Sequence, residues 1–299
     1  MQSYDSPKVY QPIILFNTIG KLIEKVIGER MQFMVISNNF IYSCQLDGLK
    51  QRSTSDAEVV LIHFIQIEWV KNCTTNTLAF DIAQFFPLLN HHLLSSILVK
   101  AGFKPKVLTF FCNYLVGRKT KYLWNNFSSP FFNVDIGVGQ GSALSPILSA
   151  LYLLPIFHIF ENWLKNLKIS ISTLSFIDDR LLIVQDKSMT MSNTNLFCSY
   201  NVITNLLTKF RLTIEHGKTE VFHFSRSQES FNLPSLNLTP LGGSVLHLKT
   251  TWYYLGFIFN YKLLFWQYVD FYANKAISTI KYMKILGNSL RSLNPIQKR

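Results

Sequence analysis

Apolar and polar residues alternate along the chain in patterns that predict helices interleaved with short strands. Apolar side chains recur at helical spacing over residues 14–34, and a second helical stretch covers about 55–70. Proline, glycine and polar residues bound the later apolar runs, which predict helices at Asn90 to Gly102, Pro105 to Gly117, 145–167, 194–210 and 267–289.

Short apolar runs between polar residues predict the strands: Thr77 to Ile82, Lys121 to Trp124, Phe131 to Ile136, 219–224 and 251–259. The segment Ile171 to Val184 is apolar on both sides of Asp178-Asp179, which predicts a β-hairpin with the carboxylates at its tip. Helices interleaved with hairpin-like strands indicate an α+β fold and not a doubly wound sheet.

The charge balance adds a candidate class of partner. Lysine and arginine outnumber aspartate and glutamate by 29 to 17, which gives a formal net charge of +12. This excess favours a polyanion such as nucleic acid, although a merely basic protein or a fragment of a more balanced whole would share it. Charged residues make up only 15%, so some apolar surface is expected to meet a partner or a missing part of the polypeptide.

The cysteines and the longest apolar run argue for an intracellular chain with no membrane span. The four cysteines form no CxxC pair and lie at no zinc-finger spacing, so they are interpreted as buried thiols. The run Leu144 to Phe160 is too short and too interrupted by serine, proline and histidine to cross a bilayer. It predicts a core helix.

Aspartates at two strand ends are the first candidates for chemistry. Asp81 ends an apolar strand, where burial is costly unless a positive group binds it. Asp178 and Asp179 are adjacent carboxylates, which a divalent cation between them would stabilise. Together these aspartates could hold two magnesium ions for a phosphoryl transfer. Asp178-Asp179 alone would equally fit a solvated turn.

A glycine-containing loop precedes the long predicted helix. The sequence Gly137-Val138-Gly139-Gln140-Gly141-Ser142-Ala143-Leu144-Ser145-Pro146 has small residues where another molecule could approach the backbone. It matches neither the dinucleotide-binding glycine pattern nor a P-loop. A flexible loop before a helix start is the alternative interpretation.

The order of these motifs resembles the reverse transcriptases of non-LTR (LINE-like) retrotransposons, from about residue 10 to 259. An FDIxxFFP-type element at Phe80 to Pro87, a GxxQGSxLSP loop and FxDD follow one another, and then Gly217-Lys218-Thr219-Glu220 and Tyr254-Leu255-Gly256. The upstream segments 20–30 and 48–56 resemble the fingers of that family. The resemblance implies a right-hand polymerase with fingers, palm and a partial thumb: 1–75 fingers, 76–260 palm with inserted fingers helices, and 261–299 the start of a thumb.

The resemblance also implies roles for particular residues. Asp81, Asp178 and Asp179 would be the catalytic metal ligands, with the Ile82 carbonyl completing a shell for two Mg²⁺ or Mn²⁺ ions. Phe86 would exclude a ribose 2′-hydroxyl, and Gln140, Gly141 and Lys218 would contact the deoxynucleoside triphosphate, with Lys218 as proton donor to pyrophosphate. The primer grip would be Tyr254, Leu255 and Gly256. A core phenylalanine, a solvated lysine and an ordinary strand end are the alternative interpretations of Phe86, Lys218 and the grip.

The implied partners are an RNA template, a DNA primer, dNTPs and the rest of a retroelement polyprotein, with no membrane. The family leads us to expect work at nuclear DNA, although the chain has no clear basic localisation run. With no endonuclease or RNase H-like domain and only the start of a thumb, the chain is expected to be a fragment of a larger polyprotein.

Three positions depart from the family pattern. Gln11 stands where an arginine is expected to touch the triphosphate, Asp47 lies in a usually neutral stretch, and Arg180 follows FxDD where glycine is common. These departures support a rival hypothesis, a truncated and catalytically decayed fragment that at most binds nucleic acid. A metal-dependent phosphohydrolase would use the same carboxylates but leaves the glycine-containing loop unexplained.

Overall fold

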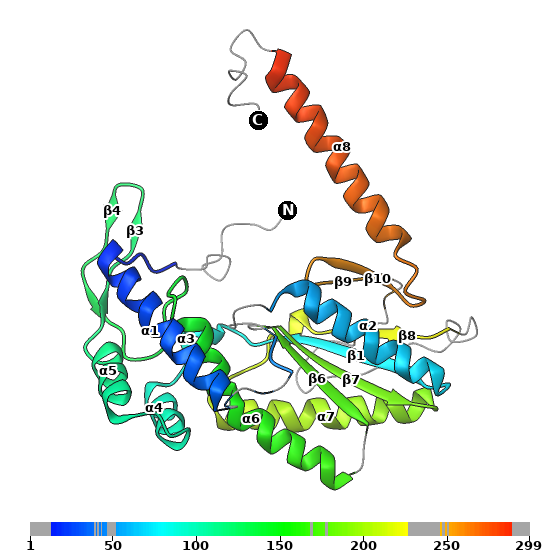
Figure 1. The fold of residues 1–299 in the computed structure, drawn as a ribbon, viewed down its shortest axis with the longest axis horizontal. Helices are drawn as coiled ribbons and strands as arrows, with labels where there is room; N and C mark the ends of the chain where they lie inside the picture. Colours follow the sequence, from blue (N-terminus) through cyan, green and yellow to red (C-terminus); the bar gives the residue numbers. More distant parts are fainter. Residues whose placement is uncertain are drawn as a thin grey trace.

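The computed structural model describes residues 13–38, 40, 42, 44–46, 52–167, 170–176, 179–226, 246, 249 and 251–288. Gln11, Asp47 and Asp178 lie outside these residues. The described part mixes helices and antiparallel strands, as the sequence predicts. A central sheet carries helices on both faces, a helical lobe lies beside it, and one long helix projects away (Figure 1).

The central sheet has four strands in the order β6-β7-β1-β8, and every neighbouring pair is antiparallel. The strands are β1 (Thr74–Asp81), β6 (Ile171–Phe176), β7 (Asp179–Asp186) and β8 (Glu220–Phe224). The inner strands are buried along most of their length because α6 and α7 cover one face while α2 covers the other (Figure 1). The covering helices are α2 (Thr54–Val70), α6 (Ser145–Leu167) and α7 (Met189–Lys209).

The lobe beside the sheet holds α1, three further helices and a long hairpin. Its helices are α1 (Thr18–Ser37), α3 (Phe85–Leu88), α4 (His91–Lys100) and α5 (Pro105–Leu115). Asn17 caps α1, since its side-chain oxygen accepts from the Gly20 N–H at 2.6 Å. The hairpin consists of β2 (Lys119–Thr120), β3 (Leu123–Trp124), β4 (Phe127–Ser128) and β5 (Phe132–Asn133).

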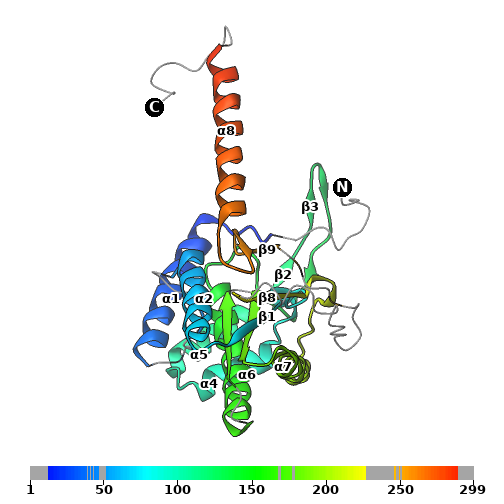
Figure 2. The same ribbon diagram turned by 90° about the vertical axis from the view of Figure 1, so that its right-hand side faces the viewer.

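The β9–β10 hairpin lies over the sheet face that α2 occupies, and α8 projects away from it. The bounds are β9 (Thr251–Tyr254), β10 (Phe257–Asn260) and α8 (Trp266–Asn288), and the 3₁₀ turn η2 (His216–Lys218) precedes β8. Helix α8 projects from the same side of the molecule as the β3–β4 hairpin in both views (Figures 1 and 2). Its side chains are largely exposed from Trp266 to Met283.

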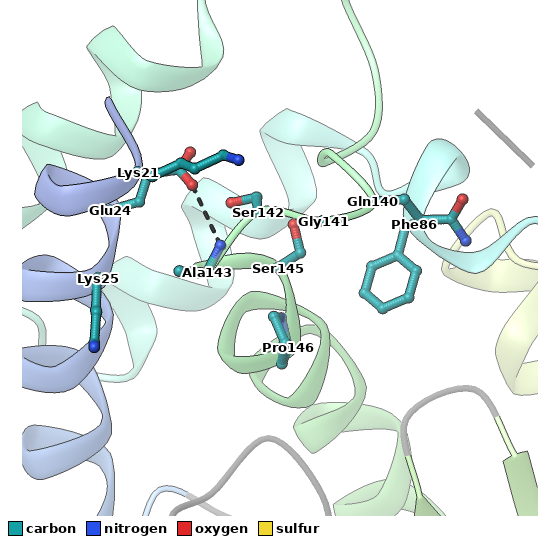
Figure 3. Close-up of a pocket in the computed structure, with 10 residues that line it drawn as sticks. All are labelled: Lys21, Glu24, Lys25, Phe86, Gln140, Gly141, Ser142, Ala143, Ser145 and Pro146. Atoms are coloured by element: carbon teal, nitrogen blue, oxygen red, sulfur yellow. Dashed lines mark hydrogen bonds between the residues drawn. The ribbon is translucent and has the colours of Figure 1, made fainter. Parts of the chain in front are cut away.

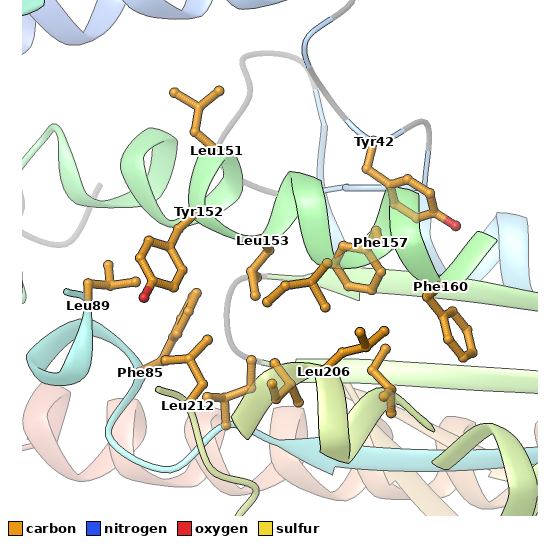
Figure 4. Close-up of a cluster of buried hydrophobic side chains, with 14 of the residues drawn as sticks. Tyr42, Phe85, Leu89, Leu151, Tyr152, Leu153, Phe157, Phe160, Leu206 and Leu212 are labelled. Atoms are coloured by element: carbon orange, nitrogen blue, oxygen red, sulfur yellow. The ribbon is translucent and has the colours of Figure 1, made fainter. Parts of the chain in front are cut away.

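The core forms two clusters on opposite faces of the sheet. The larger cluster packs α6 against α7 and the lobe, with buried side chains such as Tyr152, Phe157 and Leu212 (Figure 4). The smaller one joins α2 to β8, β9 and β10 around Trp252 and Phe259. By length and composition alone, helix α6 could cross a membrane, but most of its apolar stretch is buried inside this core. It is the core helix that the sequence predicts.

Three strand predictions need correction. The strand predicted over 251–259 is a hairpin, because Leu255 and Gly256 both adopt positive φ, 48° and 93°, and reverse the chain between β9 and β10. The strands predicted at Lys121 to Trp124 and Phe131 to Ile136 are broken into the four short strands β2 to β5. The short helix α3 has no counterpart among the predicted elements.

Candidate active site

Asp81 and Asp179 lie directly opposite each other across two central strands. Asp81 ends β1 and Asp179 begins β7, and their Cα atoms are partners in the antiparallel register. Directly opposed residues have Cβ atoms about 4.5–5.5 Å apart, and like charges there are destabilising. The fold therefore holds two carboxylates side by side where a cation would stabilise both.

The carboxylate of Asp81 is already bonded to one cation. Its Oδ2 accepts from the Lys218 ammonium at 2.6 Å, and its side chain is only 15% exposed. Its other oxygen, Oδ1, is buried and has no hydrogen-bond partner within the described part of the chain. A buried carboxylate oxygen without a donor is costly, and a hard divalent cation is the ligand that would satisfy it.

The predicted site is only partly visible at this point. Asp178, the second predicted metal ligand, lies outside the described residues. Among the residues that the structure describes, no three His, Cys, Asp or Glu side chains gather as a metal site. Ile82, whose carbonyl was predicted to complete a shell, is buried and forms an isolated antiparallel bridge with Ile214. The metal roles of these residues stay predictions.

Arg180 lies beneath the same strand ends. Its side chain is 2% exposed, and its guanidinium lies 5.7 Å from the Phe85 ring centroid and 5.8 Å from that of Phe157. One guanidinium nitrogen, Nη1, donates to the Asp179 carbonyl at 2.9 Å. The two aromatic faces stabilise the buried charge by cation–π attraction. The departure seen in the sequence therefore places a positive charge next to the candidate carboxylates.

A pocket of about 400 Å³ opens between α1 and the glycine-containing loop (Figure 3). The structure brings together three residues that the sequence singled out for the nucleotide, since Phe86, Gln140 and Gly141 all line this pocket. Sequence reasoning missed the opposite wall, which is formed by Lys21, Glu24 and Lys25 of α1. The spacing of the two lysines, four residues apart, puts them on one helix face.

Glu24 fixes α1 to the loop. This carboxylate is 4% exposed, accepts from the Tyr114 hydroxyl at 2.7 Å, and accepts from the Ala143 N–H at 3.2 Å (Figure 3). Burial, with the neighbouring Glu24 acting in the same direction, raises the pKa of Tyr114 to about 12. Tyr114 therefore remains a neutral donor at physiological pH, which keeps the pocket wall and the loop in contact.

The loop is also anchored at its start. The Gly137 carbonyl accepts from Arg118 Nη1 at 3.1 Å and from His91 Nε2 at 2.7 Å. Gly137 has φ +81°, and a Cβ there would lie 2.5 Å from the Pro87 carbonyl oxygen. A Cβ on Gly139 would lie 2.8 Å from Ile14. Glycine is required at position 137 because of its positive φ and the close backbone of Pro87, whereas at position 139 only the end of the Ile14 side chain would have to move.

The Tyr254-Leu255-Gly256 segment forms the turn between β9 and β10. Tyr254 is buried, and its pKa is raised by burial and then by the nearby Asp179 carboxylate. The turn is therefore close to the candidate carboxylates, although contact with a primer stays a prediction. From α8, the Tyr272 hydroxyl donates to the Gly256 carbonyl at 2.8 Å.

The amino-acid sequence is similar to a known protein family and to one retroelement polyprotein. Residues 4–259 match the family model described as reverse transcriptase (RNA-dependent DNA polymerase). The chain is 23% identical over 209 residues to the retrovirus-related Pol polyprotein from type-1 retrotransposable element R2 of Popillia japonica. That match covers 68% of this chain and 34% of the relative, so the chain spans about a third of the polyprotein's length.

Solved telomerase structures share the fold. A telomerase from Candida tropicalis in complex with a fragment of telomeric RNA superposes with a TM-score of 0.55 at 14% identity, over 83% of this chain and 37% of that chain. An apo telomerase from the same organism, truncated from its C-terminal domain, gives 0.53 at 13% identity, over 81% and 44%. At this identity the likeness concerns the fold alone.

Proposed function

The chain belongs to the reverse transcriptase (RNA-dependent DNA polymerase) family, and from that premise we propose that it is the polymerase domain of a non-LTR retroelement. It would extend a DNA primer on an RNA template with deoxynucleoside triphosphates. The observation that carries the proposal is the register pair of Asp81 and Asp179, with one Asp81 oxygen buried and without a donor in the described residues.

The reaction forms a bond between the primer 3′-oxygen and the α-phosphorus, and it breaks the bond from that phosphorus to pyrophosphate. The hydroxyl proton passes to solvent water, and pyrophosphate departs with the electron pair of the broken bond. Two Mg²⁺ or Mn²⁺ ions held by Asp81, Asp178, Asp179 and the Ile82 carbonyl would lower the pKa of the hydroxyl and neutralise the leaving group. The donor set fits such ions because it consists of hard oxygen ligands.

The remaining residues of the site would position the nucleotide. Phe86 and Gln140 lie in one pocket wall, where the Phe86 ring would crowd a ribose 2′-hydroxyl and favour deoxynucleotides. Lys21 and Lys25 across the pocket supply positive charge for phosphates. Lys218, which is paired with Asp81 in this structure, would be the group that protonates the leaving pyrophosphate.

The nucleic acid and protein partners follow from the same proposal. The turn at Tyr254, Leu255 and Gly256 would grip the primer end, and α8, with Lys275 and Lys281 on exposed positions, would begin a thumb along the duplex. Residues 1–75 and the lobe helices would form the fingers, and most of 76–260 the palm. The rest of a retroelement polyprotein would complete the enzyme at nuclear DNA. We propose no membrane partner.

A decayed fragment that only binds nucleic acid is the second candidate. Gln11 removes an expected phosphate contact, and the buried Arg180 charge beneath the carboxylates opposes cation binding. Both would weaken nucleotide addition without altering the fold.

Primer extension on an RNA template, in magnesium or manganese, tests the proposal. Wild type should extend, whereas Asp81→Asn and Asp178→Asn should abolish extension and keep the circular dichroism spectrum. Asp186→Asn is the matched control, because Asp186 lies at the far end of the strand that Asp179 begins. No extension from wild type, with duplex binding retained, would leave the second candidate.

A further inference from the structure

The hairpin over residues 119–133 presents exposed aromatic side chains away from both core clusters. Two short ladders build it, and Asn125 at its tip adopts φ 52°, a left-handed conformation that asparagine tolerates. Between the ladders, the Ser129 N–H donates to the Tyr122 carbonyl at 3.0 Å. The hairpin projects from the lobe in both views (Figures 1 and 2).

One face of this hairpin is aromatic. Trp124 and Phe127 are directly opposed, and they are 60% and 61% exposed. Tyr122 lies two residues before Trp124, so strand alternation puts both on one side. Its ring centroid is 5.1 Å from that of Phe132. The face therefore offers successive flat rings to a partner in solution.

The charge of the segment fits an anionic partner. Arg118, Lys119 and Lys121 precede the face, and Asp135 is the one acidic residue between positions 117 and 136. Lys119 and Lys121 are exposed, and the Lys121 ammonium lies 5.4 Å from the Phe131 ring centroid. By the same alternation, Lys119 and Lys121 lie on the reverse side of the strand from Tyr122 and Trp124, so they flank the aromatic face. Exposed rings with flanking lysines favour single-stranded nucleic acid, because bases stack while the long lysine side chains neutralise phosphates.

The base of the hairpin is joined to the candidate nucleotide pocket. Arg118 donates to the carbonyl of Gly137, the first residue of the glycine-containing loop, and the Arg118 carbonyl accepts from the Val134 N–H at 2.8 Å. The pocket-lining residues Gln140 and Gly141 follow in the same loop. A strand held on the hairpin is thereby fixed relative to the pocket.

We propose that this aromatic face, Tyr122, Trp124, Phe127 and Phe132, is a stacking platform for the unpaired template strand ahead of the pocket. The proposal rests on the function proposed above, which supplies a template, and it adds the surface that receives the strand before copying. Stacking needs no base-specific contact, so the platform would accept any sequence.

Fluorescence anisotropy of the full chain tests the platform without requiring catalysis. The probes are a labelled primer–template duplex with blunt ends and the same duplex with an unpaired 5′ template extension. Wild type should prefer the extended duplex, and Trp124→Ala should weaken binding of that duplex by about fivefold or more. Trp124→Phe should retain most of the preference because the ring is kept. Lys121→Gln should reduce the slope of the logarithm of the binding constant against the logarithm of salt concentration by about one.

Phe33→Ala is the matched control, since Phe33 is an exposed aromatic residue near the C-terminal end of α1, outside the hairpin. It should leave the preference for the extended duplex intact. Equal binding of the two duplexes by wild type, or an unchanged preference in Trp124→Ala, overturns the platform. The platform is also overturned if sedimentation shows that Trp124→Ala abolishes self-association while RNA binding is unchanged. The face would then be a contact between copies of this chain. Failure of primer extension with the preference retained would refute the proposed activity and leave the platform standing.

Discussion

The ammonium of Lys218 lies 2.6 Å from Oδ2 of Asp81, although 137 positions separate the two residues in the chain. Backbone contacts bring the two residues together. Beyond β1, Ile82 bridges Ile214, and the Glu215 N–H donates to the Asp81 carbonyl at 2.9 Å. The 3₁₀ turn that follows carries Lys218 back over the strand end. A cation thus already neutralises the carboxylate that is proposed to bind metal.

Replacing Lys218 with glutamine should have opposite effects on metal binding and on rate. Without the competing ammonium, Mn²⁺ should bind more tightly, as measured by electron paramagnetic resonance. Single-turnover extension should slow by about 10²- to 10⁴-fold, the usual contribution of a general acid. Lys209→Gln, an exposed lysine at the end of α7, serves as control. An unchanged extension rate would remove Lys218 from the proposed chemistry.

Gly137→Ala should destabilise the fold more than Gly102→Ala. Both glycines have positive φ, 81° and 76°, so both substitutions carry a similar backbone strain of about 1–3 kcal/mol. A Cβ on Gly102 meets nothing within 4 Å, whereas one on Gly137 would lie 2.5 Å from the Pro87 carbonyl oxygen. Urea denaturation measures the free energy of unfolding of both variants, and the difference between them is the cost of the contact with Pro87. Equal losses in the free energy of unfolding would show that the loop moves aside.

The contributions of Glu24 and Tyr114 to the free energy of unfolding should be coupled through their hydrogen bond. Glu24→Ala leaves the Tyr114 hydroxyl and the Ala143 N–H without this acceptor, at a cost of about 1–3 kcal/mol. The double variant with Tyr114→Phe should lose less than the sum of the single losses, by about 0.5–3 kcal/mol. Lys25→Ala on the same helix should change little, because its side chain is exposed. Additive losses in urea denaturation would contradict the coupling.

Local sequence patterns predicted elements well where the periodicity is strong and the ends are marked. The helix at 145–167 is found with these bounds, since serine and proline open it and its apolar residues face the core. The hairpin of β9 and β10 was missed because Leu255, a bulky residue at φ 48°, gives none of the Asn-Gly signal typical of such turns.

The candidate site was predictable only in part. Asp81 and Asp179 could be singled out as strand-end carboxylates, but their register depends on the pairing of β1 with β7, which no local pattern fixes. Phe86, Gln140 and Gly141 meet in one pocket as the family resemblance implies, while their contact with a nucleotide stays a prediction. Glu24 carries no such signal, because a charged residue on an amphipathic helix normally faces solvent.

A buried polar network in the central sheet connects stability to pH. His223 of β8 is 6% exposed, and its Nδ1 bonds to Asn76 Oδ1 on β1. The Asn76 amide in turn donates to Asn193 Oδ1 on α7 at 2.6 Å. Burial lowers the pKa of His223 from 6.5 to about 4, so the folded protein holds a neutral imidazole.

The free energy of unfolding should therefore fall as the pH drops from about 6.5 towards 4, because His223 binds a proton in the unfolded chain but not in the folded protein. The loss from this group is on the order of 3 kcal/mol across that window and should level off below it. Urea denaturation at several pH values measures it. His223→Gln should flatten this part of the profile, whereas His158→Gln, at an exposed position of α6, should not. A wild-type profile no steeper than that of His223→Gln would show that the fold does not lower the pKa of His223. The added proton would then be on Nε2, because Nδ1 already donates its hydrogen to Asn76 Oδ1.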